Sequence, residues 1–106
     1  MEINGNKLMI NNNEVCFEFD IQQAIEFDNI IVVRFGGEEA ENNVIAVEKN
    51  GREIWKINDI LKINQAGNFM EIEKVSDSVL GAYYIWGIYF EIDIEHRKVI
   101  KKEYTR

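Results

Sequence analysis

The sequence predicts an all-β fold of about eight antiparallel strands in two consecutive meanders. Short segments of alternating apolar and polar residues recur along the chain, and turn-forming residues separate them. Proline is absent and glycine occurs 7 times, so nothing indicates a linker or a low-complexity segment. A strand–turn–strand pattern in residues 44–56 occurs again in residues 89–101, 45 positions later. Repeats of about this length usually form units that bury their apolar faces by stacking on each other.

The repeat extends upstream and divides a single domain into two halves. Residues 28–33 are similar to residues 77–82, at an offset of 49. A chain of 106 residues with 46% hydrophobic residues fits one domain with a substantial core. We therefore expect one β domain over residues 1–106, with repeat halves at about 1–57 and 68–106.

The first half opens with a predicted hairpin of residues 7–10 and 14–19, joined by a turn of three asparagines. Residues 21–27 are ambiguous. One helical turn fits part of them, but an extended connection suits the surroundings better. Residues 30–35 are apolar at consecutive positions, which is typical of a central strand that is covered on both faces.

The clearest hairpin of the chain covers residues 43–57. Asn50-Gly51 at its centre predicts a two-residue type I′ turn, because these residues tolerate the positive φ angles that such a turn requires. Residues 58–63, directly after the hairpin, predict a short helical turn that is capped by Asn58.

The second half begins with predicted strands over residues 69–75 and 79–84, joined by a polar turn. A final hairpin follows, in which we expect every second side chain to face the core. We assign Trp55 of the first half to packing between the two halves. If the turn of the final hairpin matches that of the first copy, Asp93 lies opposite Lys98. The same register places Ile92 opposite Val99. The inward residues are Ile88, Phe90, Ile92 and Ile94, and the outward residues are Tyr89, Glu91, Asp93 and Glu95.

Both copies of the repeat resemble a β-propeller blade. Residues 44–55 are similar to the outer hairpin of quinoprotein-type propeller repeats, and so are residues 86–93. The second copy departs from that pattern, with Glu95-His96 at its turn and Ile100 where a tryptophan would stand. Two blades cannot close a ring of roughly four to eight. The resemblance therefore implies a half-propeller-like stack or a sandwich.

Small proteins with this organisation resemble bacterial immunity proteins. More specifically, they resemble the half-propeller-type immunity partners of contact-dependent growth-inhibition nuclease toxins. Such proteins bind and block a toxin that a neighbouring cell delivers. The resemblance implies a non-enzymatic inhibitor that neutralises a cognate basic toxin domain.

The formal net charge is −7, and it is unevenly distributed along the chain. Residues 96–106 carry five basic side chains and one acidic side chain, so the rest of the chain is more acidic than the total. A field of this sign repels phosphate backbones, which argues against direct binding of nucleic acid. It would attract a basic protein and accelerate the encounter. The alternative is that the acidity serves only to keep the protein soluble.

Cysteine use and the N-terminal sequence predict a cytoplasmic protein. The single cysteine, Cys16, excludes an internal disulfide and fits a reducing compartment. We expect it in a strand, buried or half-buried. The first residues lack the basic start, apolar core and cleavage pattern of a signal peptide. No apolar run approaches the roughly 20 residues needed to span a bilayer, so we expect no membrane partner.

No residue pattern predicts catalysis, a metal site or a cofactor. His96 is the single histidine and lies at a predicted turn. A lone histidine lacks the partners that acid–base chemistry needs, so we interpret it as an exposed turn residue. There is no Cys-x-x-Cys motif, no histidine pair and no calcium-loop spacing. Glu38, Glu39 and Glu41 could gather a cation, but a solvated acidic loop is the simpler interpretation.

Three groups of residues are candidates for binding a protein partner. The first is an outward row on the last hairpin, the predicted acidic row, whose neighbours are about 6–7 Å apart on one face. Its three carboxylates could occupy the cationic cleft of a nuclease in place of phosphates, or could simply pair with the next strand. The second is an aromatic cluster, which fits an interface or a core equally well. The third is the acidic loop with Glu38, Glu39 and Glu41. The acidic row is Tyr89, Glu91, Asp93 and Glu95, and the aromatic cluster is Tyr83, Tyr84, Trp86 and Tyr89.

The sequence leaves two functional hypotheses. The first is an inhibitor that binds a basic protein, with aromatic anchors and an acidic surface. The second is a structural or self-assembling β-module, since open meanders leave edge strands that could pair into a homodimer. An enzyme that uses Glu91 and Asp93 is disfavoured, because outward neighbours on one strand point in parallel and would not flank a bond.

Overall fold

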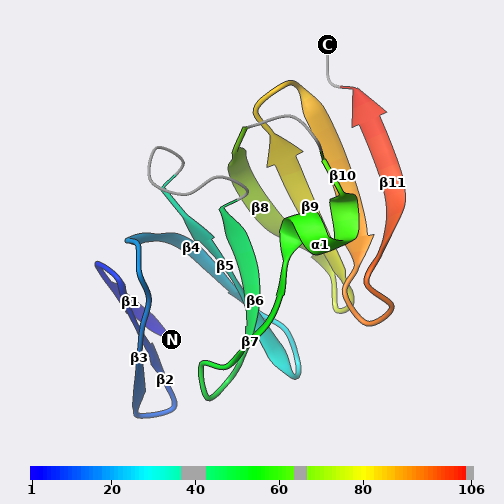
Figure 1. Cartoon of the computed structure of the whole chain (residues 1–106). Coiled ribbons are helices and arrows are strands. Elements are labelled where there is room, and N and C mark those ends of the chain that lie inside the picture. The colour runs from blue at the N-terminus through cyan, green and yellow to red at the C-terminus, as the bar shows by residue number, and fades with distance from the viewer. Residues whose placement is uncertain (37–42, 64–66, 105–106) are drawn as a thin grey trace.

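The structure is a computed structural model that describes residues 1–36, 43–63 and 67–104. Within these residues the protein is all-β, with 11 strands and one short helix, and the strands form three antiparallel sheets. The sheets lie on one another in a sandwich-like stack that is not closed into a barrel (Figure 1). The predicted all-β fold of antiparallel meanders is confirmed. The predicted count of about eight strands is too low.

The sequence predicted that the opening hairpin belongs to the first half. In the structure it lies outside the four-stranded meander of that half. It forms a separate N-terminal sheet together with a strand that the sequence analysis missed. Strand β3 ends at Cys16, three residues before the predicted end. Phe17 still donates its N–H to Asn6 O over 2.8 Å, and Ile21 then donates to Gly5 O over 2.9 Å. These bonds turn the chain toward the next sheet. The N-terminal sheet has the order β1-β2-β3, with β1 Glu2–Asn4, β2 Lys7–Ile10 and β3 Asn13–Cys16.

Apart from the opening hairpin, the two repeat halves form two sheets of the same design, each a four-stranded meander. The segment after residue 20 is a full strand that pairs with its successor, not merely an extended connection. The middle sheet contains β4 Ile21–Glu26, β5 Ile30–Phe35, β6 Val44–Glu48 and β7 Glu53–Lys56. The C-terminal sheet contains β8 Phe69–Ser76, β9 Val79–Tyr84, β10 Ile88–Asp93 and β11 Lys98–Tyr104.

Two hydrophobic cores hold the three layers together, and the middle sheet contributes to both. On β5, Val32 belongs to the core shared with the C-terminal sheet, whereas Ile31 and Val33 belong to the core shared with the N-terminal sheet. All three side chains are fully buried. The expectation of a central strand covered on both faces is therefore confirmed. Trp55 is buried in the first of these cores, between the two repeat halves, as expected.

The turn between β6 and β7 differs from the prediction. Gly51 has a positive φ of 95°, but Asn50 is absent from the positive-φ residues. Gly51 donates its N–H to Glu48 O, and Glu48 donates to Arg52 O, both over 2.8 Å, which encloses a three-residue loop. The Asn50 side chain accepts the Arg52 N–H over 3.0 Å and favours this loop over a two-residue turn. A side chain at position 51 would also clash with Val15 of the N-terminal sheet, so glycine is needed for packing as well.

The predicted helical turn exists, but Asn58 does not begin it. Helix α1, Ile57–Leu61, begins one residue earlier, and the Asp59 carboxylate accepts the Lys56 N–H over 3.0 Å at its N-terminal end. Asn58 acts at the other end, where its Oδ1 accepts the Ile63 N–H over 2.6 Å. The side chain of Asn58 therefore closes the helix instead of opening it.

Two side-chain amides connect the middle sheet to the free edge of β8. Asn43, which is 1% exposed, accepts the Phe69 N–H over 2.7 Å and donates to Phe69 O over 3.1 Å. Gln23 does the same at Ile72, accepting the N–H over 2.9 Å and donating to the carbonyl over 3.0 Å. Each amide thus satisfies the backbone groups that a further strand would otherwise bond. We call these two contacts the amide bridges.

Candidate protein-binding surface

The C-terminal sheet covers the core with one face and leaves the other face without a further layer among the described residues. Its strand register sets the composition of this outer face. Glu73, Gly81 and Glu91 lie opposite one another across three strands, and so do Glu71, Tyr83 and Tyr89 in the neighbouring row. Further along, β11 adds Glu103 beside Tyr89 and Lys101 beside Glu91. We call this surface the acidic outer face, and its members are Glu71, Glu73, Tyr83, Tyr89, Glu91, Asp93, Lys98, Lys101 and Glu103.

Two tyrosines form the centre of the acidic outer face. The rings of Tyr83 and Tyr89 lie 4.6 Å apart between centroids, at an angle of 40°. They can lie flat on the sheet because Gly81 has no side chain: a Cβ there would be 2.8 Å from the Tyr89 hydroxyl oxygen. Tyr89 lies on the outer face of the sheet, as expected, but it is only 8% exposed and therefore does not protrude as an anchor. Its ring lies beneath the surrounding carboxylate side chains of the acidic outer face.

Carboxylates surround the two hydroxyl groups. Tyr89 donates to Glu91 Oε2 over 2.7 Å, and Glu73 Oε1 lies within 3.4 Å of the Tyr89 hydroxyl and 3.3 Å of the Tyr83 hydroxyl. Burial raises the pKa of Tyr89 above its ordinary value of 10.0, and the hydrogen bond to Glu91 and its charge raise it further. Burial, followed by the charge of Glu73, also raises the pKa of Tyr83. Both phenols therefore stay protonated and hold the carboxylates in fixed positions.

The negative charge of this face is balanced only in part. Five carboxylates and two lysines belong to it, and both lysines lie on β11. Lys101 is 3.5 Å from Glu103, a contact in which both side chains are about half exposed. Exposed ion pairs of this kind contribute little to stability, so most of this charge remains available to a partner.

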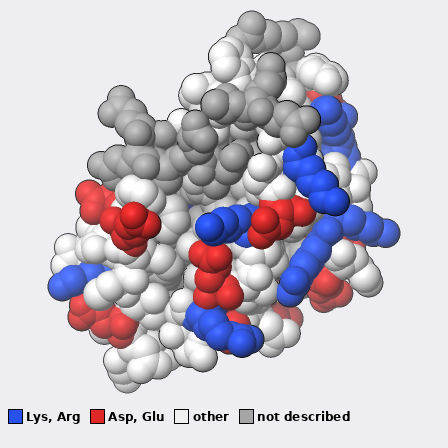
Figure 2. All heavy atoms as spheres, in the orientation of Figure 1, with Lys and Arg blue, Asp and Glu red and all other residues white. Residues whose placement is uncertain are grey.

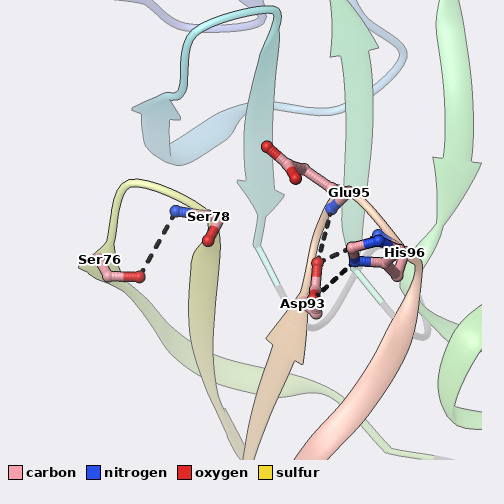
Figure 3. Close-up of polar contacts among 5 residues, drawn as sticks. All are labelled: Ser76, Ser78, Asp93, Glu95 and His96. Atoms are coloured by element: carbon pink, nitrogen blue, oxygen red, sulfur yellow. Dashed lines mark hydrogen bonds and ion pairs between the residues drawn. The ribbon is translucent and has the colours of Figure 1, made fainter.

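The predicted acidic row does not exist as a line of three free carboxylates. Its register is confirmed, since Asp93 pairs with Lys98 and Ile92 with Val99. However, Asp93 is engaged by its own turn: its Oδ1 accepts the N–H groups of Glu95 and His96, each over 3.0 Å (Figure 3). These bonds, with the hydrogen bond to the His96 side chain, lower the pKa of Asp93.

His96 is an exposed turn residue, as expected, and it is paired with Asp93. Its Nδ1 lies 2.9 Å from Asp93 Oδ2, and its side chain is 68% exposed. Figure 3 also shows Ser76 and Ser78 on the neighbouring β8–β9 turn, where Ser78 donates its N–H to Ser76 Oγ. No interaction joins either serine to His96 in this view. The Asp93–His96 pair therefore has no serine nucleophile in contact with it.

The aromatic cluster divides between the core and the surface. Tyr84 is 2% exposed and packs against Phe69 with ring centroids 5.0 Å apart, so it is a core residue and not a binding anchor. Trp86 is 56% exposed at the tip of the β9–β10 hairpin. The three glutamates of the predicted acidic loop lie outside the described residues. Cys16 is exposed, contrary to expectation, because β3 has only one neighbouring strand and Cys16 faces away from the core.

Sequence reasoning missed the glutamates of β8. Glu71 and Glu73 lie at a spacing of two, on either side of the buried Ile72. That alternation was a usable signal, but their place beside Tyr83, Tyr89 and Glu91 depends on the register of four strands. The sequence predicted a line of outward residues along one strand. In the folded sheet, the acidic residues instead form a patch that extends across several strands.

No group of three or more histidine, cysteine, aspartate or glutamate residues that could hold a metal ion occurs in the described part of the chain. The single helix described, α1, is too short and too polar to cross a membrane.

Taken together, the fold and the surface define a small all-β protein of stacked sheets with an acidic, tyrosine-centred outer face. The chain belongs to a family described as a domain of unknown function, DUF7957, whose model matches residues 1–104. No curated protein and no solved structure matches the chain.

Proposed function

We propose that this protein is a non-enzymatic inhibitor that binds a basic protein through its acidic outer face. More specifically, we propose an immunity protein that neutralises a cognate nuclease-type toxin domain. The observation that carries the proposal is the gathering of Glu73, Glu91 and two stacked tyrosines on a sheet face that no described layer covers. A nuclease holds phosphates in a cationic cleft, and a fixed patch of carboxylates is complementary to such a cleft.

The arrangement of the carboxylates favours binding over mere solubility. Solubilising charges are usually dispersed on mobile side chains, whereas Glu91 and Glu73 are held by tyrosine hydroxyl groups. Pre-organised side chains lose less conformational entropy when they bind. Tyrosine is also enriched among residues that dominate binding energy. A partner would therefore meet an acidic surface with a rigid aromatic base.

The proposal is tested with the product of the gene directly upstream. We expect co-purification of the two proteins and protection of cells that express that product. The decisive variant is Glu73→Gln/Glu91→Gln, which removes two charges from the acidic outer face. We expect it to weaken binding about tenfold, mainly through slower association, and to reduce the salt dependence of the association rate.

The matched control is Glu2→Gln/Glu14→Gln, which removes the same charge from exposed positions of the N-terminal sheet. It should bind within about twofold of the unmodified protein, because charges beyond a Debye length are largely screened. Equal losses in both variants would assign binding to net charge alone. A partner that binds both variants with full affinity, or a neighbouring product that is harmless to cells, would contradict the proposal.

A further inference from the structure

Strand β11 is the open edge of the C-terminal sheet. It pairs with β10 on one side, and no described strand lies on its other side. All seven of its residues are exposed. The opposite edge of the same sheet is different, because the amide bridges of Gln23 and Asn43 occupy the backbone groups of β8. The C-terminal sheet thus has one closed edge and one open edge.

The open edge is basic on a protein that is acidic overall. Lys98 and Lys101 lie on the same side of β11 as the acidic outer face, since they pair with Asp93 and Glu91. Lys102 lies on the other side, opposite Phe90, with its ammonium group 5.4 Å from the centre of the Tyr104 ring. In Figure 2, basic side chains gather on the side of the molecule where Figure 1 places β11 and α1. Both faces of a strand added here would meet positive charge.

A hollow lies beside this edge, between β11 and the end of α1. Its volume is about 280 Å³, and the apolar side chains of Ile63, Ile88 and Phe90 line it. Lys62 and Lys102 add positive charge at its border. The hollow can therefore accept an apolar side chain of an extended segment. The neighbouring side chains of that segment point to the opposite face, where carboxylates can pair with Lys98 and Lys101.

A second copy of the chain fits this edge poorly. Two β11 strands related by a two-fold axis pair antiparallel, with one residue opposite itself. If that residue is Ile100, Lys98 lies opposite Lys102 of the other copy. If it is Lys101 or Lys102, that lysine faces its own image. Like charges directly opposite each other on paired strands are destabilising, so the lysines oppose a homodimer through β11.

We propose that β11 binds an acidic, extended segment of a protein partner by strand addition. The charges that repel a second copy attract such a segment, and the hollow beside α1 receives one of its apolar side chains. The site lies at the edge of the C-terminal sheet and does not depend on the function proposed for the acidic outer face. A partner that used both surfaces would need a basic region and an acidic strand.

The test uses the full chain and three synthetic peptides of seven residues, the length of β11. The acidic probe is acetylated Thr-Glu-Val-Glu-Val-Glu-Thr, and the second peptide replaces each Glu by Lys. The third keeps the acidic sequence but carries N-methyl groups on alternate backbone amides, which block strand pairing without changing charge. We expect the acidic probe to bind at least about tenfold more tightly than either of the others.

Hydrogen exchange locates the binding. The acidic probe should slow amide exchange within residues 98–104 and leave exchange in the N-terminal sheet unchanged. The variant Lys101→Gln/Lys102→Gln should lose about fivefold or more in affinity, whereas Lys7→Gln/Lys49→Gln, with the same change in charge, should not. Equal binding of the N-methylated peptide, protection outside residues 98–104, or no binding of the acidic probe at millimolar concentration would overturn the proposal. So would a stable dimer of the unmodified protein that protects β11.

Discussion

The side chain of Tyr89 shows how one residue can combine packing with recognition. Its ring lies over the bare backbone of Gly81, and its hydroxyl group donates to Glu91 over 2.7 Å. The glutamate is thereby fixed on the surface, and the tyrosine is removed from solvent. A mutation here would affect stability and the arrangement of the acidic outer face together.

The raised pKa of Tyr89 makes a prediction about alkaline pH. Because this pKa is higher in the folded state than in the unfolded state, the associated stability is fully present below about pH 10 and is lost as the pH rises further. We expect the unfolding midpoint of the unmodified protein to fall between about pH 9 and about pH 11, and that of Tyr89→Phe to fall less. Thermal unfolding followed by circular dichroism across this range measures the difference.

The control for this experiment is Tyr104→Phe, which changes a tyrosine that is 68% exposed. Its unfolding midpoint should fall with pH as steeply as that of the unmodified protein, because both proteins retain Tyr89 and lose the same charges on lysine side chains. If Tyr89→Phe declines as steeply as Tyr104→Phe, the carboxylates around Tyr89 do not hold its proton in the way described.

At the scale of elements, the amide bridges replace a strand at the edge of β8. Gln23 lies on β4, and its amide occupies both backbone groups of Ile72 in the other sheet. The register of the two sheets relative to each other therefore depends on a polar contact as well as on the apolar core. Such a contact specifies one alignment, whereas apolar side chains tolerate small shifts.

Replacing Gln23 should therefore have a local and a global effect. We expect Gln23→Ala to reduce the free energy of unfolding by about 1–3 kcal/mol, since two partly buried backbone groups lose their partner. The amide of Ile72 should also exchange faster with solvent. The neighbouring Gln22→Ala, at an exposed position of the same strand, should leave both quantities unchanged. Unaltered exchange at Ile72 in Gln23→Ala would refute the edge-closing role.

The elements that the sequence predicted well are those with strong local signals. The apolar run of β5 indicated burial on both faces, and the repeat indicated two equivalent meanders. The turn type predicted for Asn50-Gly51 was wrong because the Asn50 side chain accepts the Arg52 N–H and favours a three-residue loop. The strand β4 was ambiguous because glutamines such as Gln22 and Gln23 have no strong preference for strands. The contact that Gln23 makes with Ile72 in the other sheet cannot be read from the local sequence.

The candidate site was less predictable than the fold, for a related reason. Glu91 was identified from its own strand, but Glu73 lies 18 positions away in the sequence and joins it only through the register of β8, β9 and β10. Tyr83 and Tyr84 belonged to one aromatic cluster that fitted an interface or a core equally well from the sequence. Neighbouring positions on a strand point to opposite faces, so one became core and the other surface. Which face of the strand points to the core and which to the surface depends on how the sheets stack, and the sequence alone does not specify that.

At the scale of the whole molecule, the middle sheet is shared by both cores. Leu8 is fully buried in the core of the N-terminal sheet, and Leu80 is fully buried in the core of the C-terminal sheet. Because β5 contributes alternate side chains to both, loss of one core removes support from the other. We expect the three layers to unfold together.

Matched truncations in the two cores test this cooperativity. Leu8→Ala and Leu80→Ala should each cost about 2–5 kcal/mol and shift the same single unfolding transition to lower denaturant concentration. Hydrogen exchange should then report equal destabilisation of slowly exchanging amides in β5 and β9. A separate early transition in Leu8→Ala, with β9 still protected, would mean that the N-terminal sheet unfolds on its own.

The stacking order also bears on how this protein can change over generations. Ile31, Val32 and Val33 are fully buried in the two cores, so truncating them should destabilise the fold. The glutamates of the terminal layer support neither core, and substitutions among them leave the interior undisturbed. A lineage could therefore alter what this layer recognises, one residue at a time, while the scaffold beneath it stays the same.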